Sequence, residues 1–163
     1  MFKKISVFFL FAFFTQTKIS YCKKIDLLDQ LSLQATTVEK AILSNKEESV
    51  VSSIKEMMRM GWEIMRLYST KYPECYTQYE FFSSHEDELK KLGPISLKLK
   101  FHNGNGLPKA PKHCYFGRTI LIHSALGFAK KREGFNKETR KSAAHDFEEI
   151  NEHLPKIRSK LTA

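Results

Sequence analysis

"SNKEESVVSSIKEMMRMGWEIMRLYSTKYP" (residues 44–73) is the stretch that decides the fold class. Its apolar residues recur every three or four positions, so at about 100° per residue they share one face of an α-helix. Ser44 or Asn45 supplies a helix cap, and Pro73 ends the helix because the residue before a proline is pushed out of the helical region. We therefore expect a helix over residues 46–71. Its apolar face consists of Val50, Ile54, Met57, Met58, Gly61, Trp62, Ile64, Met65 and Tyr68.

Three further segments, residues 25–43, 111–132 and 136–160, also have helical periodicity. The first and the last are amphipathic, with apolar residues along one side only. The middle segment is apolar most of the way round, which is typical of a central, well-covered helix. Pro155 should kink the last helix, because proline removes a backbone donor and clashes with the preceding turn.

The segment between the second and third main helices predicts a long crossover. Ser83 and Glu86 have the spacing of a capping box at the start of a short helix. "ISLKLKFH" (residues 95–102) alternates with period two, as strands do. It has no partner strand to pair its backbone, so we interpret it as an extended connector or a short distorted helix. The fold class is therefore all-α, a small bundle of four main helices with a long crossover of short helix and turns.

The first 22 residues have the features of a secretory signal peptide. Two lysines precede an apolar run of ten residues, which is too short for a membrane span of about 20. We expect cleavage after Cys22, leaving residues 23–163 as a single domain in the periplasm or outside the cell. A lipid anchor on Cys22 is the alternative, but Tyr21 is bulky for that signal. Cleavage removes three lysines and no acid, so the net charge falls from +9 to +6.

Cys75 and Cys114 are the cysteines that the mature chain keeps. In an oxidising compartment an isolated pair of cysteines favours a disulfide. The bond would close a loop of about 40 residues, which in the loop-entropy model stabilises the fold by roughly 4 kcal/mol.

Three histidines fall within "KFHNGNGLPKAPKHCYFGRTILIH" (residues 100–123), at His102, His113 and His123. Histidines of this kind usually pack at helix interfaces, but they can also bind metal or haem. His113 and His123 would lie about 15 Å apart along a helix, too far to share one ion unaided. Arg118, on the same apolar helix, is a candidate anchor for an anionic group. We take these four residues as candidate ligand-binding residues and predict no cofactor, with a haem or metal site as the alternative.

Enzyme signatures are missing from the sequence. It contains no nucleophile elbow, phosphate-binding glycine loop or dinucleotide fingerprint. Cys114 and His113 are adjacent on a helix and therefore do not face each other. His145 and Glu149 lie opposite the apolar stripe of their helix, which predicts a solvated face instead of an acid–base pair. We therefore expect a non-enzymatic role.

Three glycines, Gly61, Gly117 and Gly127, lie inside predicted helices, where each costs roughly 0.5–1 kcal/mol against alanine. Close approach of two helices would offset this cost. Room for a ligand between the second and third main helices is the alternative explanation.

Positive charge gathers near the turn between the last two helices, which predicts peripheral contact with an anionic membrane surface. The residues concerned are Lys130, Lys131, Arg132, Arg140 and Lys141. Nucleic acid is not expected, because the sequence lacks a recognised binding motif. The sequence as a whole predicts an exported helical bundle that binds a partner protein, an envelope component or a small ligand through the crossover and the third main helix.

Overall fold

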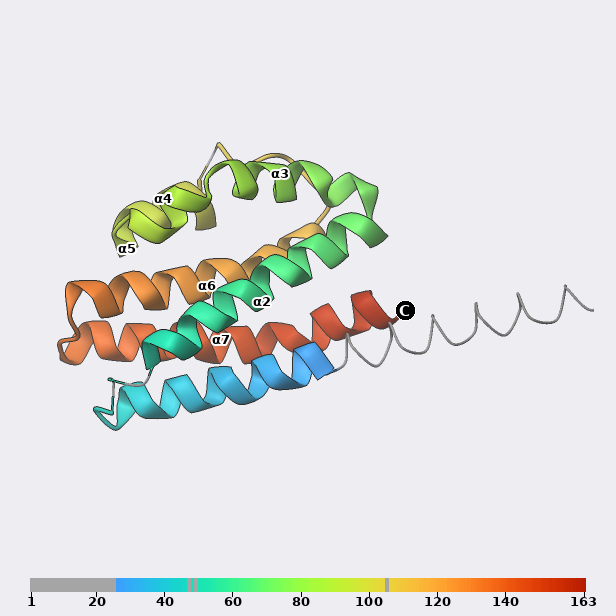
Figure 1. Ribbon diagram of the computed structural model, residues 1–163. Helices are drawn as coiled ribbons and strands as arrows, with labels where there is room; N and C mark the ends of the chain where they lie inside the picture. Colours follow the sequence, from blue (N-terminus) through green and yellow to red (C-terminus); the bar gives the residue numbers. More distant parts are fainter. Residues whose placement is uncertain (1–25, 47, 49, 105) are drawn as a thin grey trace, which may run out of the picture.

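All regular secondary structure is helical in the part of the chain that the computed structural model describes, residues 26–46, 48, 50–104 and 106–163 (Figure 1). A first helix covers residues 26–43. The later elements are α2 (Val50–Lys71), η2 (Pro73–Cys75), α3 (Tyr76–Ser84), α4 (Glu86–Lys91), α5 (Pro94–Leu97), η3 (Lys98–His102), α6 (Cys114–Glu133) and α7 (Lys137–Thr162). The predicted signal peptide, its cleavage site and the alternative lipid anchor at Cys22 lie outside the described residues.

The four long helices form the bundle, as predicted, and the short ones form the crossover. In Figure 1, α2 crosses in front of α6 and α7, and the helix over residues 26–43 runs beside α7. The α6 helix packs along both α2 and α7. Residues 120–127 of α6 are all buried, which confirms the central position predicted from its all-round apolar sequence.

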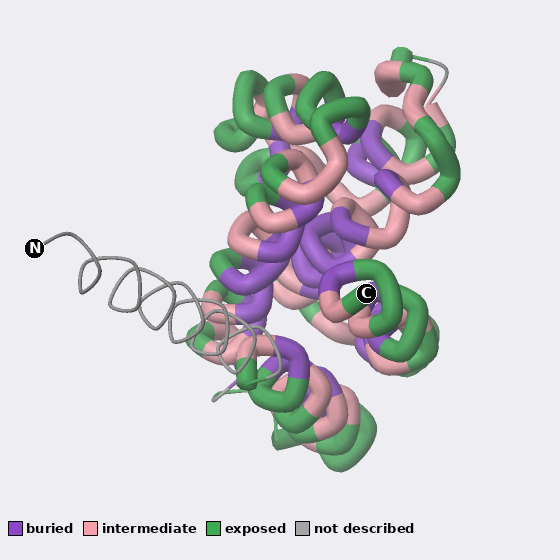
Figure 2. The backbone as a smooth tube through the Cα atoms, turned by 90° about the vertical axis from the view of Figure 1, so that its right-hand side faces the viewer, coloured by how far each residue is buried: buried purple, intermediate pink, exposed green. Residues whose placement is uncertain are grey.

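The buried residues lie where the helices face one another (Figure 2), and their apolar side chains form two groups. One joins residues 26–43 to α2 and α7, and includes Leu31, Ile54 and Phe147. The other joins the crossover to α2 and α6 through residues such as Phe82 and Phe101, both fully buried. A large buried apolar side chain contributes about 1.5–3 kcal/mol, so the crossover is a packed layer of the fold.

The crossover shows where local patterns mislead. "ISLKLKFH" is helical, with α5 followed by the π-helical η3, so the distorted-helix interpretation is confirmed and the extended connector is wrong. The reason is burial at helical spacing, because Leu97 and Phe101 are four residues apart and both face the core. The predicted capping box is also wrong, since Ser83 lies in the last turn of α3 and His85 precedes α4.

The ends of the long helices differ from prediction by a few residues. The α2 helix begins at Val50, and α6 begins at Cys114, after the turn that follows Pro111. The α7 helix begins with a capping box, in which the Asn136 side chain accepts from the backbone of residue 139 and the hydroxyl of Thr139 accepts from the backbone N–H of Asn136. It remains helical through Pro155 to Thr162.

The glycines inside helices are explained by close packing. A Cβ atom at Gly61 would lie 2.9 Å from the backbone Cα and N of Leu121, so this glycine lets α2 approach α6 closely. At Gly117 and Gly127 the rings of Tyr68 and Phe147 occupy the corresponding space. The idea of ligand room between α2 and α6 is therefore wrong at these positions.

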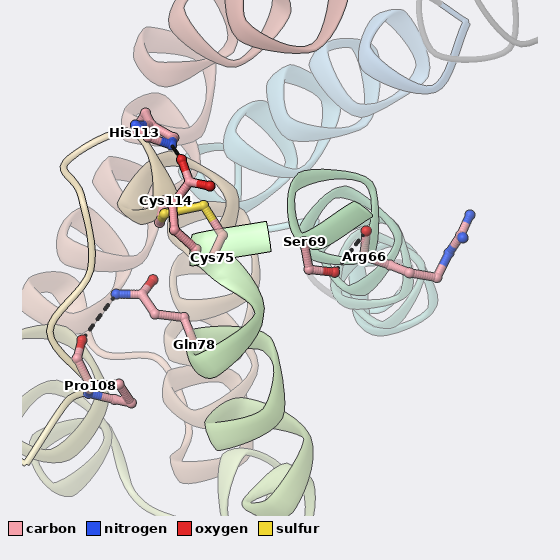
Figure 3. Close-up of a disulfide and its surroundings, with 8 residues drawn as sticks. Arg66, Ser69, Cys75, Gln78, Pro108, His113 and Cys114 are labelled. Atoms are coloured by element: carbon pink, nitrogen blue, oxygen red, sulfur yellow. Dashed lines mark hydrogen bonds and ion pairs between the residues drawn. A yellow bond between two sulfur atoms is a disulfide. The ribbon is translucent and has the colours of Figure 1, made fainter. Parts of the chain in front are cut away.

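A disulfide joins Cys75 to Cys114, as predicted (Figure 3). Both residues are buried, with 2% and 3% of their surface exposed. The bond ties the beginning of the crossover to the first residue of α6, and so fixes the two ends of a long excursion of the chain.

None of the helices in the described part of the chain is both long and apolar enough to cross a membrane.

Candidate metal centre

Three potential metal ligands converge from η3, α6 and α7. His102 ends η3, His123 lies in the buried middle of α6, and Glu149 lies on α7. One ring nitrogen of each histidine and one carboxylate oxygen of Glu149 all lie within 4.8 Å of one another. The two imidazole rings meet edge to face with their centroids 5.4 Å apart, and His123 Nε2 is 2.9 Å from Glu149 Oε2.

The local structure explains this convergence. Phe101 is fully buried and anchors η3 on the bundle, and α5 and η3 both contact α6. The π-helical turn from Lys98 ends at His102, whose ring is thereby held against α6. Single π-helical turns are rare and often occur at functional sites. The position of His102 thus depends on how the crossover packs, which residue spacing alone does not reveal.

A second layer of polar groups surrounds the histidines. The Nδ1 atom of His123 is 3.4 Å from Asp146 Oδ1, and Asp146 Oδ2 accepts a hydrogen bond of 2.6 Å from Lys130 Nζ. The Nδ1 atom of His102 is 2.5 Å from Asn103 Oδ1. When each Nδ1–H donates to its oxygen partner, each Nε2 keeps a free lone pair, which is the arrangement of metal-binding histidines with carboxylate or amide support.

The carboxylates around His123 favour a cation between them. Asp146 faces one ring nitrogen and Glu149 the other, and His123 is 3% exposed. An imidazolium would satisfy both carboxylates as a double donor. A metal ion on Nε2 would satisfy the same groups, because it binds the Glu149 oxygen directly and leaves Nδ1–H for Asp146.

Glu149 also contacts His145, whose Nε2 is 3.4 Å from Glu149 Oε1. A hydrogen bond from His145 to Glu148 raises the pKa of His145, with smaller contributions from Glu149 and Asp146. The predicted solvated face is right for His145, which is exposed. It is wrong for Glu149, which is about a third exposed and turns its other oxygen to His123.

The three ligands line a cleft of about 290 Å³. Its other walls come from α5, η3, α6 and α7, and include Ile95, Lys98, Leu126 and Ser142. Small-molecule pockets usually measure roughly 300–1,000 Å³. The cleft therefore suits an ion with a small ligand better than a haem macrocycle.

His113 lies apart from this centre, at the disulfide (Figure 3). Its Nε2 is 3.0 Å from Glu74 Oε1, and its ring is 4.6 Å from that of Tyr72. His113, Cys75 and Cys114 form a second close group, but sulfurs joined in a disulfide are not thiolate ligands. The predicted separation of His113 from His123 thus agrees with the structure.

Arg118 braces η3. Its Nη2 donates to the backbone carbonyl of His102 at 3.4 Å, and its guanidinium lies 4.5 Å from the centre of the Tyr115 ring. Burial lowers the pKa of Arg118, and Tyr115 partly opposes that effect. Arg118 therefore reaches the centre through the backbone of His102.

Asp146, Lys130 and Glu149 were not predicted to be part of this centre. Asp146 was the one with a usable signal, because it lies one turn from both Ala143 and Ile150 on the apolar side of α7. A charged residue at such a position needs a partner.

Some of the basic residues near the turn between α6 and α7 make contacts within the fold. Lys130 pairs with Asp146, and Arg132 donates to the carbonyls of residues 90, 91 and 92 at the end of α4. Lys131 and Arg140 lie 5.7 and 5.8 Å from the centre of the Phe135 ring. Membrane contact through this cluster stays a prediction, with fewer outward charges than the sequence suggested.

No protein-family model, curated protein or solved structure matches this chain.

Proposed function

We propose that this protein is an exported, non-enzymatic helical bundle that binds a divalent transition-metal ion of the zinc class through His102, His123 and Glu149. The observation that carries the proposal is the convergence of these three groups, each from a different element, within 4.8 Å. Two imidazoles and one carboxylate form a common ligand set for zinc. Imidazole ligands disfavour calcium and magnesium, which prefer oxygen.

The ligand geometry needs only a small adjustment. Zinc bonds of about 2.0–2.2 Å in a tetrahedral arrangement place ligand atoms roughly 3.4 Å apart. His123 and Glu149 already approach to 2.9 Å. His102 and Glu149 are only half-buried, so rotation of these two side chains can bring the remaining distances into range.

The charge balance also favours a cation. Asp146 and Glu149 are the acids nearest to His123, and Lys130 balances one of them through the 2.6 Å ion pair. One negative charge therefore remains beside the two imidazoles, which favours binding of a cation.

Export is supported by the buried Cys75–Cys114 disulfide, because such bonds form and persist in oxidising compartments. It is also supported by the charged and apolar pattern of residues 1–22. A partner protein or envelope component recognised through the crossover remains a further part of the prediction.

Titration of untagged protein with Zn²⁺, followed by calorimetry and elemental analysis, tests metal binding. We expect one ion per chain. His102→Ala and Glu149→Gln should each weaken binding by at least about tenfold, since removal even of a supporting residue costs about 10–100-fold.

Two matched controls belong to this experiment. Glu148→Gln changes a neighbouring carboxylate that forms an ion pair with His145. His113→Ala changes a histidine that contacts the Glu74 carboxylate instead. Both variants should bind Zn²⁺ like the parent. Equal losses in controls and site variants, or no saturable binding by the parent, would overturn the proposal.

A further inference from the structure

We propose that the bound ion keeps one coordination position open to the cleft, and that this position takes the carboxylate oxygen of a small aliphatic monocarboxylate. This inference rests on the metal site proposed above. It adds the chemical class of a second ligand, which would bind to the ion and to the cleft together.

The open position follows from the number of protein ligands. Within the described residues, three ligand groups gather at this point: His102, His123 and Glu149. Asp146 is held by Lys130 and by the far nitrogen of His123, so it supports the site without reaching the ion. Zinc prefers four ligands, and sites with three protein ligands take the fourth from solvent or from a bound molecule.

The cleft supplies the space for this fourth ligand. It measures about 290 Å³ and is lined by all three ligand residues. The cleft therefore includes the space beside the ion and extends from there along α5 and η3. A molecule bound in the cleft would have direct access to the ion.

The charge of the cleft favours an anion once the ion is present. Glu149 neutralises one of the two metal charges, and the Lys130–Asp146 pair is balanced within itself. Lys98 is exposed and lines the cleft, which adds a positive charge. An anionic oxygen at the fourth position would therefore meet a net positive site.

The apolar part of the cleft selects among anions. Pro94, Ile95 and Leu126 line it together with the polar groups, and Ile95 is 77% exposed. A short aliphatic chain can cover this surface, whereas inorganic phosphate has no apolar part. Each buried CH₂ group contributes about 0.8 kcal/mol, or roughly a fourfold gain in affinity. Butyrate should therefore bind more tightly than acetate.

Cobalt-substituted, untagged protein provides the test, because the visible spectrum of Co²⁺ reports its ligands. Butyrate should change this spectrum with a saturable, one-to-one dependence, and acetate should do so more weakly. Lys98→Ala should weaken butyrate binding about two- to fivefold, in line with the loss of an exposed ion pair. Lys137→Ala, an exposed lysine outside the cleft, should leave it unchanged.

Ile95→Ser should reduce the preference for butyrate over acetate while leaving Co²⁺ binding intact. A Co²⁺ spectrum that no carboxylate changes would overturn the open position and leave the metal site standing. Phosphate binding as tightly as butyrate would overturn the aliphatic assignment. Failure to bind Co²⁺ at all would overturn the metal site and, with it, this inference.

Discussion

Asp146 on α7 and Lys130 on α6 form a 2.6 Å ion pair directly behind His123, and their side chains are only 9% and 12% exposed. The pair joins the two helices at the point where the candidate metal centre lies. The Asp146 carboxylate also lies 3.4 Å from Nδ1 of His123. One interaction therefore serves both the packing of α6 on α7 and the orientation of a metal ligand.

Asp146→Asn should weaken Zn²⁺ binding about 10–100-fold, because it replaces the carboxylate that orients His123. It should also lower the free energy of unfolding by about 1–3 kcal/mol, since Lys130 loses its charged partner and keeps only its hydrogen bonds to the carbonyl and hydroxyl of Ser142. Chemical denaturation and zinc calorimetry measure the two effects.

The matched control is Asp87→Asn, whose exposed carboxylate pairs with Lys91. We expect a change of about 0.5 kcal/mol or less there and no effect on zinc. An equally small stability change at Asp146 would argue against a buried pair.

Reduction of the Cys75–Cys114 bond should lower the free energy of unfolding by about 2–5 kcal/mol, because the chain loses a buried cross-link. The double variant Cys75→Ser, Cys114→Ser should behave in the same way. Urea unfolding with and without a reductant measures this change.

Zinc affinity should persist in the folded double variant, because His113 and the two sulfurs are separate from the candidate centre. Loss of zinc binding in that folded variant would instead place the metal at the disulfide.

Gly61→Ala should destabilise the fold by about 1–3 kcal/mol, since the added methyl group would press on the Leu121 backbone and overpack the contact of α2 with α6. Gly106→Ala is the control, because nothing lies within 4 Å of its added Cβ. That substitution should be neutral or slightly stabilising. Thermal unfolding of the two variants measures the difference. An unchanged melting temperature in Gly61→Ala would show that α2 and α6 can move apart at this contact at little cost in stability.

The pH dependence of stability should differ in sign between two histidines of α7. Burial lowers the pKa of His153, with smaller contributions from Lys156 and His123. The unfolded chain therefore binds a proton more readily than the folded one near the ordinary histidine pKa of 6.5, so His153 destabilises the fold as pH falls through that value. The raised pKa of His145 does the opposite. Its stabilisation is complete below 6.5 and is lost as pH rises through the folded value.

Metal-free protein unfolded thermally between pH 5 and 8 would separate these contributions. His153→Gln should make the melting temperature less sensitive to acid, and His145→Gln should make it more sensitive. Equal shifts in the same direction would contradict the assigned causes.

Mature protein recovered from an exporting host should begin at Lys23 and should lack two hydrogens relative to the reduced mass. Intact-mass and peptide mass spectrometry test both points. A chain that retains residues 1–22 and free thiols would remove the support for export.

The sequence predicted the long helices and the disulfide well, because each depends on local periodicity or on a small choice of partners. The burial of Ile54 and Ile64, for example, follows from helical spacing alone. The candidate centre was predicted only in part. His102 and His123 were identified as candidates. Their contact, however, depends on the π-helical turn of η3, and the alternating sequence of that segment is typical of a strand. Glu149 was assigned to solvent because a helical wheel does not show which neighbouring helix covers its flank.

The crossover is fastened to α6 at both of that helix's ends. Cys114 holds it at the first residue through the disulfide, and Arg132 holds it near the last through the carbonyls that end α4. Because the crossover is attached to α6 at two points, it cannot rotate away from α6 as a segment hinged at one end could. Residues 94–102 lie between these two attachments and form one wall of the cleft, so the cleft should keep its width when a ligand enters or leaves.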